Sequence, residues 1–474
     1  MARAALVIPL MLLHLATSVR GHEHHTDEIP EGEGVSKDPI DTILWIHIAI
    51  QMFSFGIIFP TGMVLGIVRS RWHVPLQTVG TVLAVLGYVL GHAHKGRQFD
   101  RNVHAAFASS LMIMLLVQVG CGIYLKLHME KGIHGKIRRF VVMGHGVLGK
   151  IMPVVSWTQM VFGGITALGF CRGDHVGQCA AHFIMGSAFI AYGIIMTIML
   201  LVGQMWLRKT GKSQEFFDSC VIAAWGCVNT FTEHRWGTAW VRNDLQHTTM
   251  GIVWWCAGLL GIWLSRRTDG SPRRNPIPGM IIFITGYGMS AHPQTLPLSE
   301  MIHTVFGYTL MAAGLTRIIE IAFILGDRNT FAKNIDSHDP NSFQYLPPFF
   351  LIASGFLFMG ATEEQMQVLS DHHVTHVSWL LIDYSLAFLV FLFVNILLHI
   401  YTIKAWPVAK KGVATTPNGS AAASSSRPNG HAHTNSDVRA LREAEEFELE
   451  GLMSDEDEGL DTPNSPAKPV ALPR

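Results

Sequence analysis

The sequence predicts an all-α polytopic membrane protein, a bundle of about eleven transmembrane helices. The mean hydropathy is +0.30 and only 15% of the 474 residues are charged, which is too apolar for an ordinary soluble domain. Apolar stretches long enough to cross a bilayer core about 30 Å thick also recur along the chain. They run over residues 43–68, 74–94, 103–127, 140–169, 181–207, 216–233, 246–265, 276–292, 301–325, 345–363 and 377–403. The sixth and eighth are the weakest, because they are short or interrupted by polar residues and glycine.

The chain begins with an apolar run over residues 4–15, preceded by Arg3 and followed by small residues. This order is typical of a cleaved secretory signal peptide, which we expect to occupy residues 1–21. The histidine-rich segment that follows, residues 22–42, would then lie on the lumenal or extracellular side.

Basic residues concentrate in alternate connections between the expected spans. They include Arg69, Arg71, Lys136, Arg138, Arg139, Arg208, Arg266, Arg273 and Lys404. By the positive-inside rule these connections face the cytosol, so the mature N-terminus lies outside it and the C-terminus inside. We therefore expect an integral membrane protein of the secretory pathway, surrounded by lipid. The formal net charge is zero, and nothing in it favours a nucleic-acid partner. The Ser/Gly/Pro-rich, then acidic tail, residues 404–474, is predicted to be disordered and cytosolic.

Two of the six cysteines, Cys171 and Cys179, flank a short polar loop. The predicted topology places this loop on the oxidising side of the membrane, where a disulfide between them can persist. The other cysteines lie in apolar segments and are expected to pack as small hydrophobic residues.

Four histidines of the first four spans fall into two pairs. His47 and His104 lie near the outer ends of spans one and three, and His73 and His145 lie near the inner ends of spans two and four. Ionisable side chains inside a membrane are costly and need partners. Two imidazoles from facing helices at one depth are what a bis-histidine haem b requires. The pattern therefore predicts two haems, His47 with His104 and His73 with His145, on the order of 20 Å apart along the membrane normal.

A second regularity concerns spans three and four. Gln118 follows His104, and Gln159 follows His145, at the same offset of fourteen residues. This offset is about four helical turns, so each glutamine faces nearly the same way as its histidine. Glycines lie close behind both glutamines, which allows a helix or a porphyrin edge to approach closely. They are Gly120, Gly122, Gly163 and Gly164.

These motifs resemble the four-helix core of the cytochrome b561 family, over residues 45–169. The similarity rests on His47 followed by Pro60, Gly62 and Arg69, on Trp72-His73 with Gln77, on His104 with Gln118, and on His145 to Lys150 with Gln159 and Gly163. The resemblance implies the same haem pairing in a core over residues 43–169. His47 lacks the frequent Gly-x-Leu after it, and a long C-terminal extension replaces the flanking helices. The chain also contains Gly91-His92-Ala93-His94 and the run from Asn229 to Trp236. With these motifs it resembles the fungal Ytp-one-like family of membrane proteins over residues 40–405.

The second membrane domain, residues 170–403 with about seven spans, carries histidines only at one end of most spans. We interpret the outer-face residues as a possible site for copper, iron or zinc, or for a third haem. The metal-ligand candidates are His182, His234, His247, His292 and His303. The alternative is that these imidazoles anchor helix ends at the membrane interface. Arg317 and Glu320, three residues apart, are expected to form an internal ion pair.

The function predicted from these features is transmembrane electron transfer, from a cytosolic reductant to an outer acceptor such as a ferric or cupric ion. Such a ferric or cupric reductase needs no acid–base pair, because the haems supply the chemistry. A small anionic donor of the ascorbate type would be drawn to the inner basic residues, with Arg69 and Lys150 the best candidates. Two alternatives are a non-redox transporter or metal-ion carrier that uses the outer-face histidines, and a haem-free scaffold. The chain could also form a homodimer.

Overall fold

The computed structural model describes residues 29–30, 33–129, 131–234, 237–291, 293–326 and 340–405. Over these residues the fold is helical, with isolated β-bridges at Val35–Phe99 and Arg266–Pro272 and no strand. The expected signal peptide, the histidines of the segment that follows it and the acidic tail lie outside the described residues. The chain divides into two compact units, Met1–Thr166 together with Val408–Arg474, and Ala167–Pro407.

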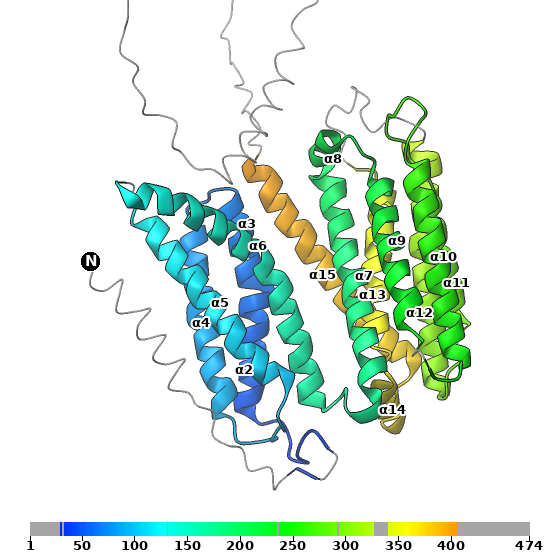
Figure 1. Ribbon diagram of the computed structural model, residues 1–474. Helices are drawn as coiled ribbons and strands as arrows, with labels where there is room; N and C mark the ends of the chain where they lie inside the picture. The colour runs from blue at the N-terminus through cyan, green and yellow to red at the C-terminus, as the bar shows by residue number, and fades with distance from the viewer. Residues whose placement is uncertain are drawn as a thin grey trace, which may run out of the picture. The chain divides into compact units, whose positions relative to one another are not determined.

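The first unit contains four long helical segments, side by side in Figure 1. They are α2 (Thr42–Phe53) continued by the π-turn η2 (Ser54–Ile58) and α3 (Phe59–Ile67), then α4 (His73–Ala93), α5 (Val103–Lys126) and α6 (Ile133–Leu168). Asp41 caps α2 by accepting the N–H of Leu44, and Asn102 caps α5 by accepting that of Ala105. These caps satisfy backbone donors that a helix start leaves unpaired.

A buried apolar layer occupies the middle of this first unit. It consists of Phe55, Phe59, Ala84, Leu111, Met112, Leu115 and Met152, with members from each of the four segments. The histidines lie toward the two ends of the helices, beyond this layer. The layer therefore separates two polar levels, which we call the His47 level and the His73 level after the first histidine of each.

The second unit contains the remaining helices. They are η3 (Gly173–His175), α7 (Val176–Leu201), α8 (Gln204–Thr210), α9 (Gln214–Thr232), α10 (Arg242–Leu264), α11 (Ile277–Ser290), α12 (Pro297–Ile319) with the π-turn η4 (Glu320–Leu325), η5 (Ser342–Tyr345), α13 (Leu346–Met359), α14 (Glu363–Asp371) and α15 (His376–Ala405). Glycines allow close helix pairs in this unit. A Cβ on Gly286 would stand 2.6 Å from the carbonyl oxygen of Gly307, and one on Gly355 2.5 Å from that of Gly186.

Nine helices within the described residues are long and apolar enough to cross a membrane. This confirms the polytopic helical class. The two weakest expected spans correspond to α9, whose first turns carry Glu215 and Asp218, and to α11, which has 14 residues. The helix expected over residues 181–207 ends earlier, at Leu201. Val202 and Gly203 leave the helical conformation, and a separate short helix, α8, follows. The short amphipathic α14 was not expected.

Candidate functional site: two levels of paired histidines

The structure brings the four histidines of the first unit together in the two expected pairs. The ring centroids of His47 and His104 are 6.2 Å apart with their planes at 88°. Those of His73 and His145 are 6.3 Å apart with their planes at 87°. Both pairs join α2 or α4 to α5 or α6, so each imidazole faces a ring from another helix.

Three of the four imidazoles are oriented by a backbone carbonyl of a second helix. His47 Nδ1 lies 2.7 Å from the oxygen of Gly87, His73 Nδ1 2.7 Å from that of Gly62, and His104 Nδ1 3.2 Å from that of Gln159. A carbonyl only accepts, so Nδ1 carries the proton. This leaves Nε2 as the ring nitrogen with a lone pair for a metal, an arrangement that usually supports metal-bound histidine. His145 Nδ1 makes no hydrogen bond of normal geometry within the described residues.

Each imidazole also lies against a glycine of the facing helix. A Cβ added to Gly91 would come within 2.7 Å of the His47 ring, and one on Gly66 within 2.8 Å of His73. The corresponding distances are 3.0 Å from Gly163 to His104 and 3.5 Å from Gly122 to His145. By contrast, Gly120 and Gly164 meet nothing within 4 Å. Only one glycine of each expected pair therefore makes room for a ring.

The spacing of these contacts repeats along the helices. In α4 and α6 the carbonyl that binds a histidine of one level lies fourteen residues after the helix's own histidine, at Gly87 after His73 and at Gln159 after His145. From His47 to Gly62 the spacing is fifteen, and the π-turn Ser54–Ile58 lies between them. A π-turn absorbs one inserted residue. At about 1.5 Å per residue, fourteen residues separate the two levels by about 21 Å.

Glutamines cross-link the same helices. Gln118 donates its side-chain amide to the carbonyl of His145 over 3.1 Å, and Gln159 donates to that of His104 over 3.0 Å. Gln51 and Gln77, each four residues after a histidine, donate to the carbonyls of Ala84 and Phe59. The equal offset of Gln118 and Gln159 is thus a signal that could be read from the sequence. The roles of Gln51 and the π-turn were not anticipated.

The two candidate donor-binding residues are both exposed. Arg69 lies in the turn between α3 and α4, with φ +50°, and its N–H donates to the oxygen of Gly66. Gly66 in turn lies against His73, so the Arg69 backbone belongs to the His73 level. Lys150 lies on α6, five residues after His145. No described contact joins Arg69 to Lys150.

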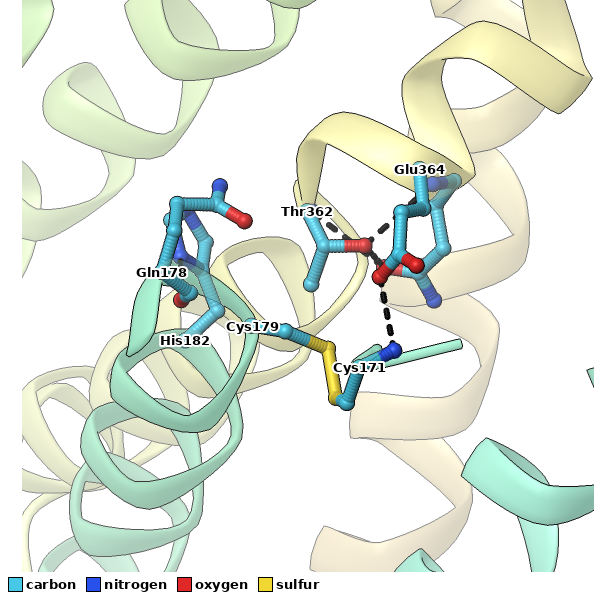
Figure 2. The surroundings of a disulfide bond; sticks show 7 residues. Cys171, Gln178, Cys179, His182, Thr362 and Glu364 are labelled. Carbon is cyan, nitrogen blue, oxygen red and sulfur yellow. Dashed lines mark hydrogen bonds between the residues drawn. A yellow bond between two sulfur atoms is a disulfide. The ribbon is translucent and has the colours of Figure 1, made fainter. Parts of the chain in front are cut away.

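In the second unit the expected cysteine pair, Cys171 and Cys179, forms a disulfide (Figure 2). The N–H of Cys171 donates to Glu364 Oε2 over 2.8 Å, which attaches this loop to α14. These three residues also form a group of close sulfur and oxygen atoms. Because both sulfurs are consumed in the disulfide, they offer no thiolate to a metal ion.

Two kinds of contact are described for the expected outer-face metal ligands. The rings of His182 and His303 lie 5.9 Å apart. His234 and His247 each face a carboxylate instead, with Nδ1 of His234 3.1 Å from Asp244 and Nδ1 of His247 3.3 Å from Glu233. His292 lies outside the described residues.

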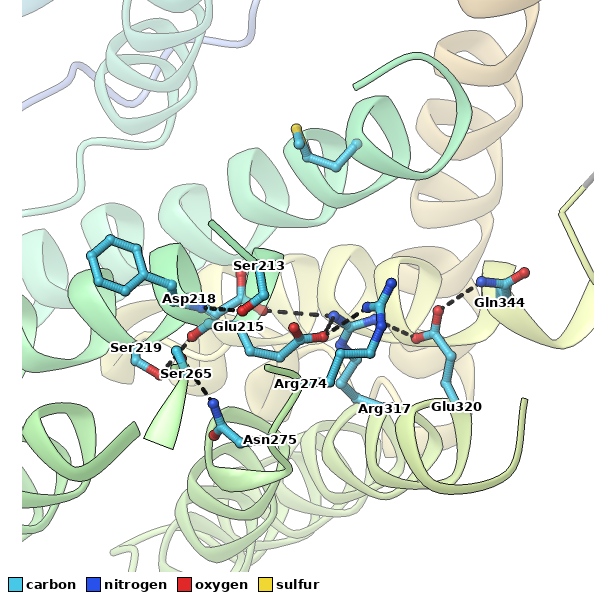
Figure 3. Close-up of polar contacts among 12 residues, drawn as sticks. Ser213, Glu215, Asp218, Ser219, Ser265, Arg274, Asn275, Arg317, Glu320 and Gln344 are labelled. Atoms are coloured by element: carbon cyan, nitrogen blue, oxygen red, sulfur yellow. Dashed lines mark hydrogen bonds and ion pairs between the residues drawn. The ribbon is translucent and has the colours of Figure 1, made fainter. Parts of the chain in front are cut away.

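Sequence reasoning missed most of a buried charged cluster in the second unit (Figure 3). The expected Arg317–Glu320 ion pair is confirmed, at 2.6 Å. Arg317 also contacts Glu215, which is fully buried, over 2.9 Å, and Arg274 contacts the same Glu215 oxygen over 3.1 Å. Asp218 completes the cluster, 3.9 Å from Arg317 and hydrogen-bonded by the Tyr192 hydroxyl. These contacts join residues up to 102 positions apart in the sequence, so no local sequence pattern predicts them.

Paired, partly buried histidines, a buried ion cluster and nine apolar helices among the described residues define this chain as a polytopic helical membrane protein. It belongs to the Ytp1-like family: the model described as "Protein YTP1-like, C-terminal" matches residues 155–402, and a domain of unknown function, DUF2427, matches residues 27–128. The chain is 45% identical to Protein YTP1 of Saccharomyces cerevisiae over 258 residues, 54% of each chain. It is 22% identical to an uncharacterized membrane protein of Schizosaccharomyces pombe, covering 74% of this chain and 91% of that one.

The match to Protein YTP1 thus spans about half the length of that relative. A second uncharacterized membrane protein of S. cerevisiae is 25% identical over 43% of this chain and 40% of its own. No solved structure matches the chain. Both uncharacterized relatives are named as membrane proteins, and the apolar helices of this chain make it an integral membrane protein too.

Proposed function

We propose that this protein carries electrons across a membrane through two b-type haems, held by His47 with His104 and by His73 with His145. The observation that carries the proposal is the ring spacing. A metal–imidazole nitrogen bond is about 2.0–2.1 Å and the nitrogen lies about 1.1 Å from the ring centre, so two imidazoles in line on one metal have centroids about 6.3 Å apart. The two pairs stand at 6.2 and 6.3 Å.

The residues of the two levels fit an iron porphyrin in three further respects. Nδ1 of three of the rings is engaged by a carbonyl, which leaves Nε2 to bind the iron. The facing glycines keep side chains away from the rings. The two ligands of each level come from different helices, as cofactor ligands in helical bundles do. When bound, the haems would supply one-electron chemistry.

The chain's own contribution is to fix the two levels and to insulate them. The Gln118 and Gln159 cross-links hold α5 against α6 at both depths. The apolar layer of Phe55, Leu115 and their neighbours excludes water between the levels. The levels are separated by about 21 Å along the helices, so one couple lies near each membrane face. This division favours a two-step relay.

We infer the direction and the reactants from the sequence resemblance of the core to the cytochrome b561 family. By the positive-inside rule the His73 level faces the cytosol, where a small anionic reductant would meet the exposed Arg69 and Lys150. The His47 level would deliver electrons to a lumenal or extracellular acceptor, such as a ferric or cupric ion. A homodimer remains compatible with this scheme. We place the N-terminus outside the cytosol and the tail inside it, in a membrane of the secretory system.

Reduced-minus-oxidised spectra of the purified full chain test the proposal. We expect a b-type α-band with two haems per chain by pyridine haemochrome, and the loss of one haem each in His104→Ala and His145→Ala. Lys150→Ala is the matched control on the same helix as His145 and should keep both haems. A chain that is colourless after expression with ample haem would exclude the relay.

The second candidate function is a metal-ion carrier or other non-redox transporter. The observation that favours it is the buried cluster of Arg317, Glu215 and Asp218, because charges inside membrane domains commonly mark transport pathways. Reconstitution into vesicles with a trapped fluorescent metal indicator separates the two functions. Metal entry without a reductant, abolished in Asp218→Asn, would support the carrier. Electron transfer to an external ferric salt from trapped ascorbate, without metal entry, would support the relay.

A further inference from the structure

Asp383 is a buried acidic residue inside a membrane-spanning helix of the second unit. It lies on α15, seven residues after His376 begins that helix, which is about 10 Å along the helix axis. Only 3% of its surface is exposed. Its carboxyl oxygen Oδ2 is buried and has no hydrogen-bond partner within the described residues. A lone acidic group of this kind in a membrane helix requires an explanation, and it commonly marks a proton or ion site.

The Asp383 carboxyl faces the C-terminal end of α13. A Cβ added to Gly360, which follows the last residue of α13, would stand 3.1 Å from Asp383 Oδ2 and 3.2 Å from the carbonyl oxygen of Phe356. Trp379, one turn before Asp383 on α15, donates its indole N–H to the carbonyl of Gly360 over 2.9 Å. This bond holds α15 against the end of α13. A carboxyl oxygen and a carbonyl oxygen therefore border the same space, which a side chain at Gly360 would fill.

The helices around α15 supply no described compensating charge to this carboxyl. Among them, α13 has no ionisable residue, and α14 adds only acidic ones. The ionisable groups of α7 and α12, which also contact α15, are His182, Tyr192, Glu300, His303, Tyr308 and Arg317. No described hydrogen bond or ion pair joins any of them to Asp383. On α15 itself, the neighbouring Tyr384 hydroxyl is hydrogen-bonded to Thr309 over 2.8 Å.

We propose that Asp383 holds an exchangeable proton inside the membrane and gives the second unit a proton-binding site of the kind that pumps and transporters use. An ionised carboxylate in an apolar environment is costly unless it is paired, and a bound proton removes that cost. The C-terminal end of α13 is the negative end of a helix dipole, which further disfavours a negative charge beside it. The protonated carboxyl has an O–H to donate, and the Phe356 carbonyl borders the same space.

The same surroundings favour a proton over a metal ion. Hard cations such as Mg²⁺ and Ca²⁺ take about six to eight oxygen ligands. Within the described residues, no group of three close metal-ligating side chains includes Asp383. The indole Nε1 of Trp379 lies 3.0 Å from the Cβ position of Gly360. An indole N–H is only a hydrogen-bond donor, so it cannot contribute a ligand to a cation.

Dicyclohexylcarbodiimide, an apolar reagent that reacts with protonated carboxyl groups, tests this site on the purified full chain in phosphatidylcholine vesicles. The carboxyl O–H adds across one C=N bond, and the adduct rearranges to a stable acylurea with nothing released. We expect peptide mass spectrometry to find this adduct on Asp383 at pH 7, where an ordinary aspartate is ionised. Labelling should fall as the pH rises, because the ionised carboxylate does not react.

Two variants control this experiment. Asp383→Asn should lose the adduct. Glu363→Gln, which removes an exposed carboxylate of α14, is the matched control and should keep the adduct on Asp383. A water-soluble carbodiimide should label Glu363 and leave Asp383 unmodified. Absence of the apolar adduct from Asp383 at every pH would overturn the proposal.

Infrared spectroscopy reads the protonation state without a reagent. The spectrum of the unmodified chain minus that of Asp383→Asn should contain a carboxylic acid C=O band at pH 7. The band should shift in D₂O, because the proton exchanges. Asp383→Glu keeps the acid and should keep the band, which separates loss of the proton from misfolding of the Asn variant. A carboxylate band in place of the acid band would overturn the proposal.

The inference is independent of the haem relay, because Asp383 belongs to the second unit. Haem is counted in the same samples, and Asp383→Asn should contain as much as the unmodified chain. Labelling of Asp383 in a colourless chain would leave this inference standing and overturn only the relay.

Discussion

The two units of this protein use the polar side chains between their helices in different ways. In the first unit, His47 and His73 reach carbonyls of a neighbouring helix segment, and Gln118 and Gln159 do the same between α5 and α6. In the second unit, His182 and His303 bind carbonyls of their own helices. Ion pairs centred on Arg317 join helices there, alongside neutral hydrogen bonds such as that from Trp254 to Thr285. Neutral cross-links therefore hold the histidine levels of the first unit, whereas the second unit adds a buried ion cluster to its neutral cross-links.

This difference predicts different sensitivities to mutation. A neutral imidazole that loses its neighbour remains an uncharged side chain, so the free energy of unfolding changes little. The expected consequence is instead the loss of the cofactor that the imidazole would hold. A buried charge that loses its partner carries a desolvation penalty that no other contact offsets. We therefore expect the second unit to fail by unfolding and the first by loss of ligand.

The largest effect is expected for Arg317→Met. It leaves Glu215, Glu320 and Asp218 with only Arg274 as a cationic partner within the described cluster. Removing one partner of a buried ion pair typically costs about 3–5 kcal/mol. Fluorescence-detected size exclusion after a temperature series should show a large loss of folded protein. In Arg317→Met with Glu320→Leu, which removes opposite charges together, more than half of the loss should return. No difference between the single and double variants would mean that the cluster is not electrostatically coupled.

The next effect concerns the glycines of the first unit. In Gly91→Val, side-chain atoms would meet the His47 ring, which a Cβ alone approaches to 2.7 Å. We expect loss of the haem at the His47 level, about half of the b-type absorbance, with little change in stability. Gly120→Val is the matched control, because a Cβ there meets nothing within 4 Å. If both variants keep two haems, glycine is not what positions the ring.

A smaller effect is expected for the disulfide. In Cys171→Ser with Cys179→Ser, a closed loop of eight residues becomes open in the unfolded chain, which typically costs about 2 kcal/mol. The hydrogen bond from Cys171 to Glu364 should persist and limit the structural change. Thermal denaturation of the purified chain with and without reductant measures the difference. If reductant does not change the melting temperature of the unmodified chain but the double variant is destabilised, the lost stability comes from side-chain packing and not from the disulfide bond.

The sequence was sufficient for features that depend on the period of the helix, and insufficient for those that depend on rotation or distant contacts. Four histidines at two depths follow from span positions, and the offset of Gln118 and Gln159 marks one helix face. Which glycine meets a ring depends on the rotation of the facing helix, so Gly120 and Gly122 could not be told apart. The contact between Glu215 and Arg317 joins distant segments, and the pattern of either helix alone contains no signal for it.

The smallest effect concerns Asp41, which joins the start of α2 to the segment that follows α4, at the His47 level. Its carboxylate accepts N–H groups of Lys95 and Leu44, over 3.0 and 2.9 Å. These bonds, that of Lys95 first, lower its pKa below the usual 3.8. A carboxyl whose pKa is lower when folded stabilises the protein above its unfolded pKa, and this contribution disappears as the pH falls through the folded value. Thermal unfolding from pH 6 down to 3 should therefore lose stability below about 4 in the unmodified chain. Asp41→Asn keeps the helix cap but should lack that part of the decline, and an unchanged pH profile would show that the carboxylate is not coupled to folding.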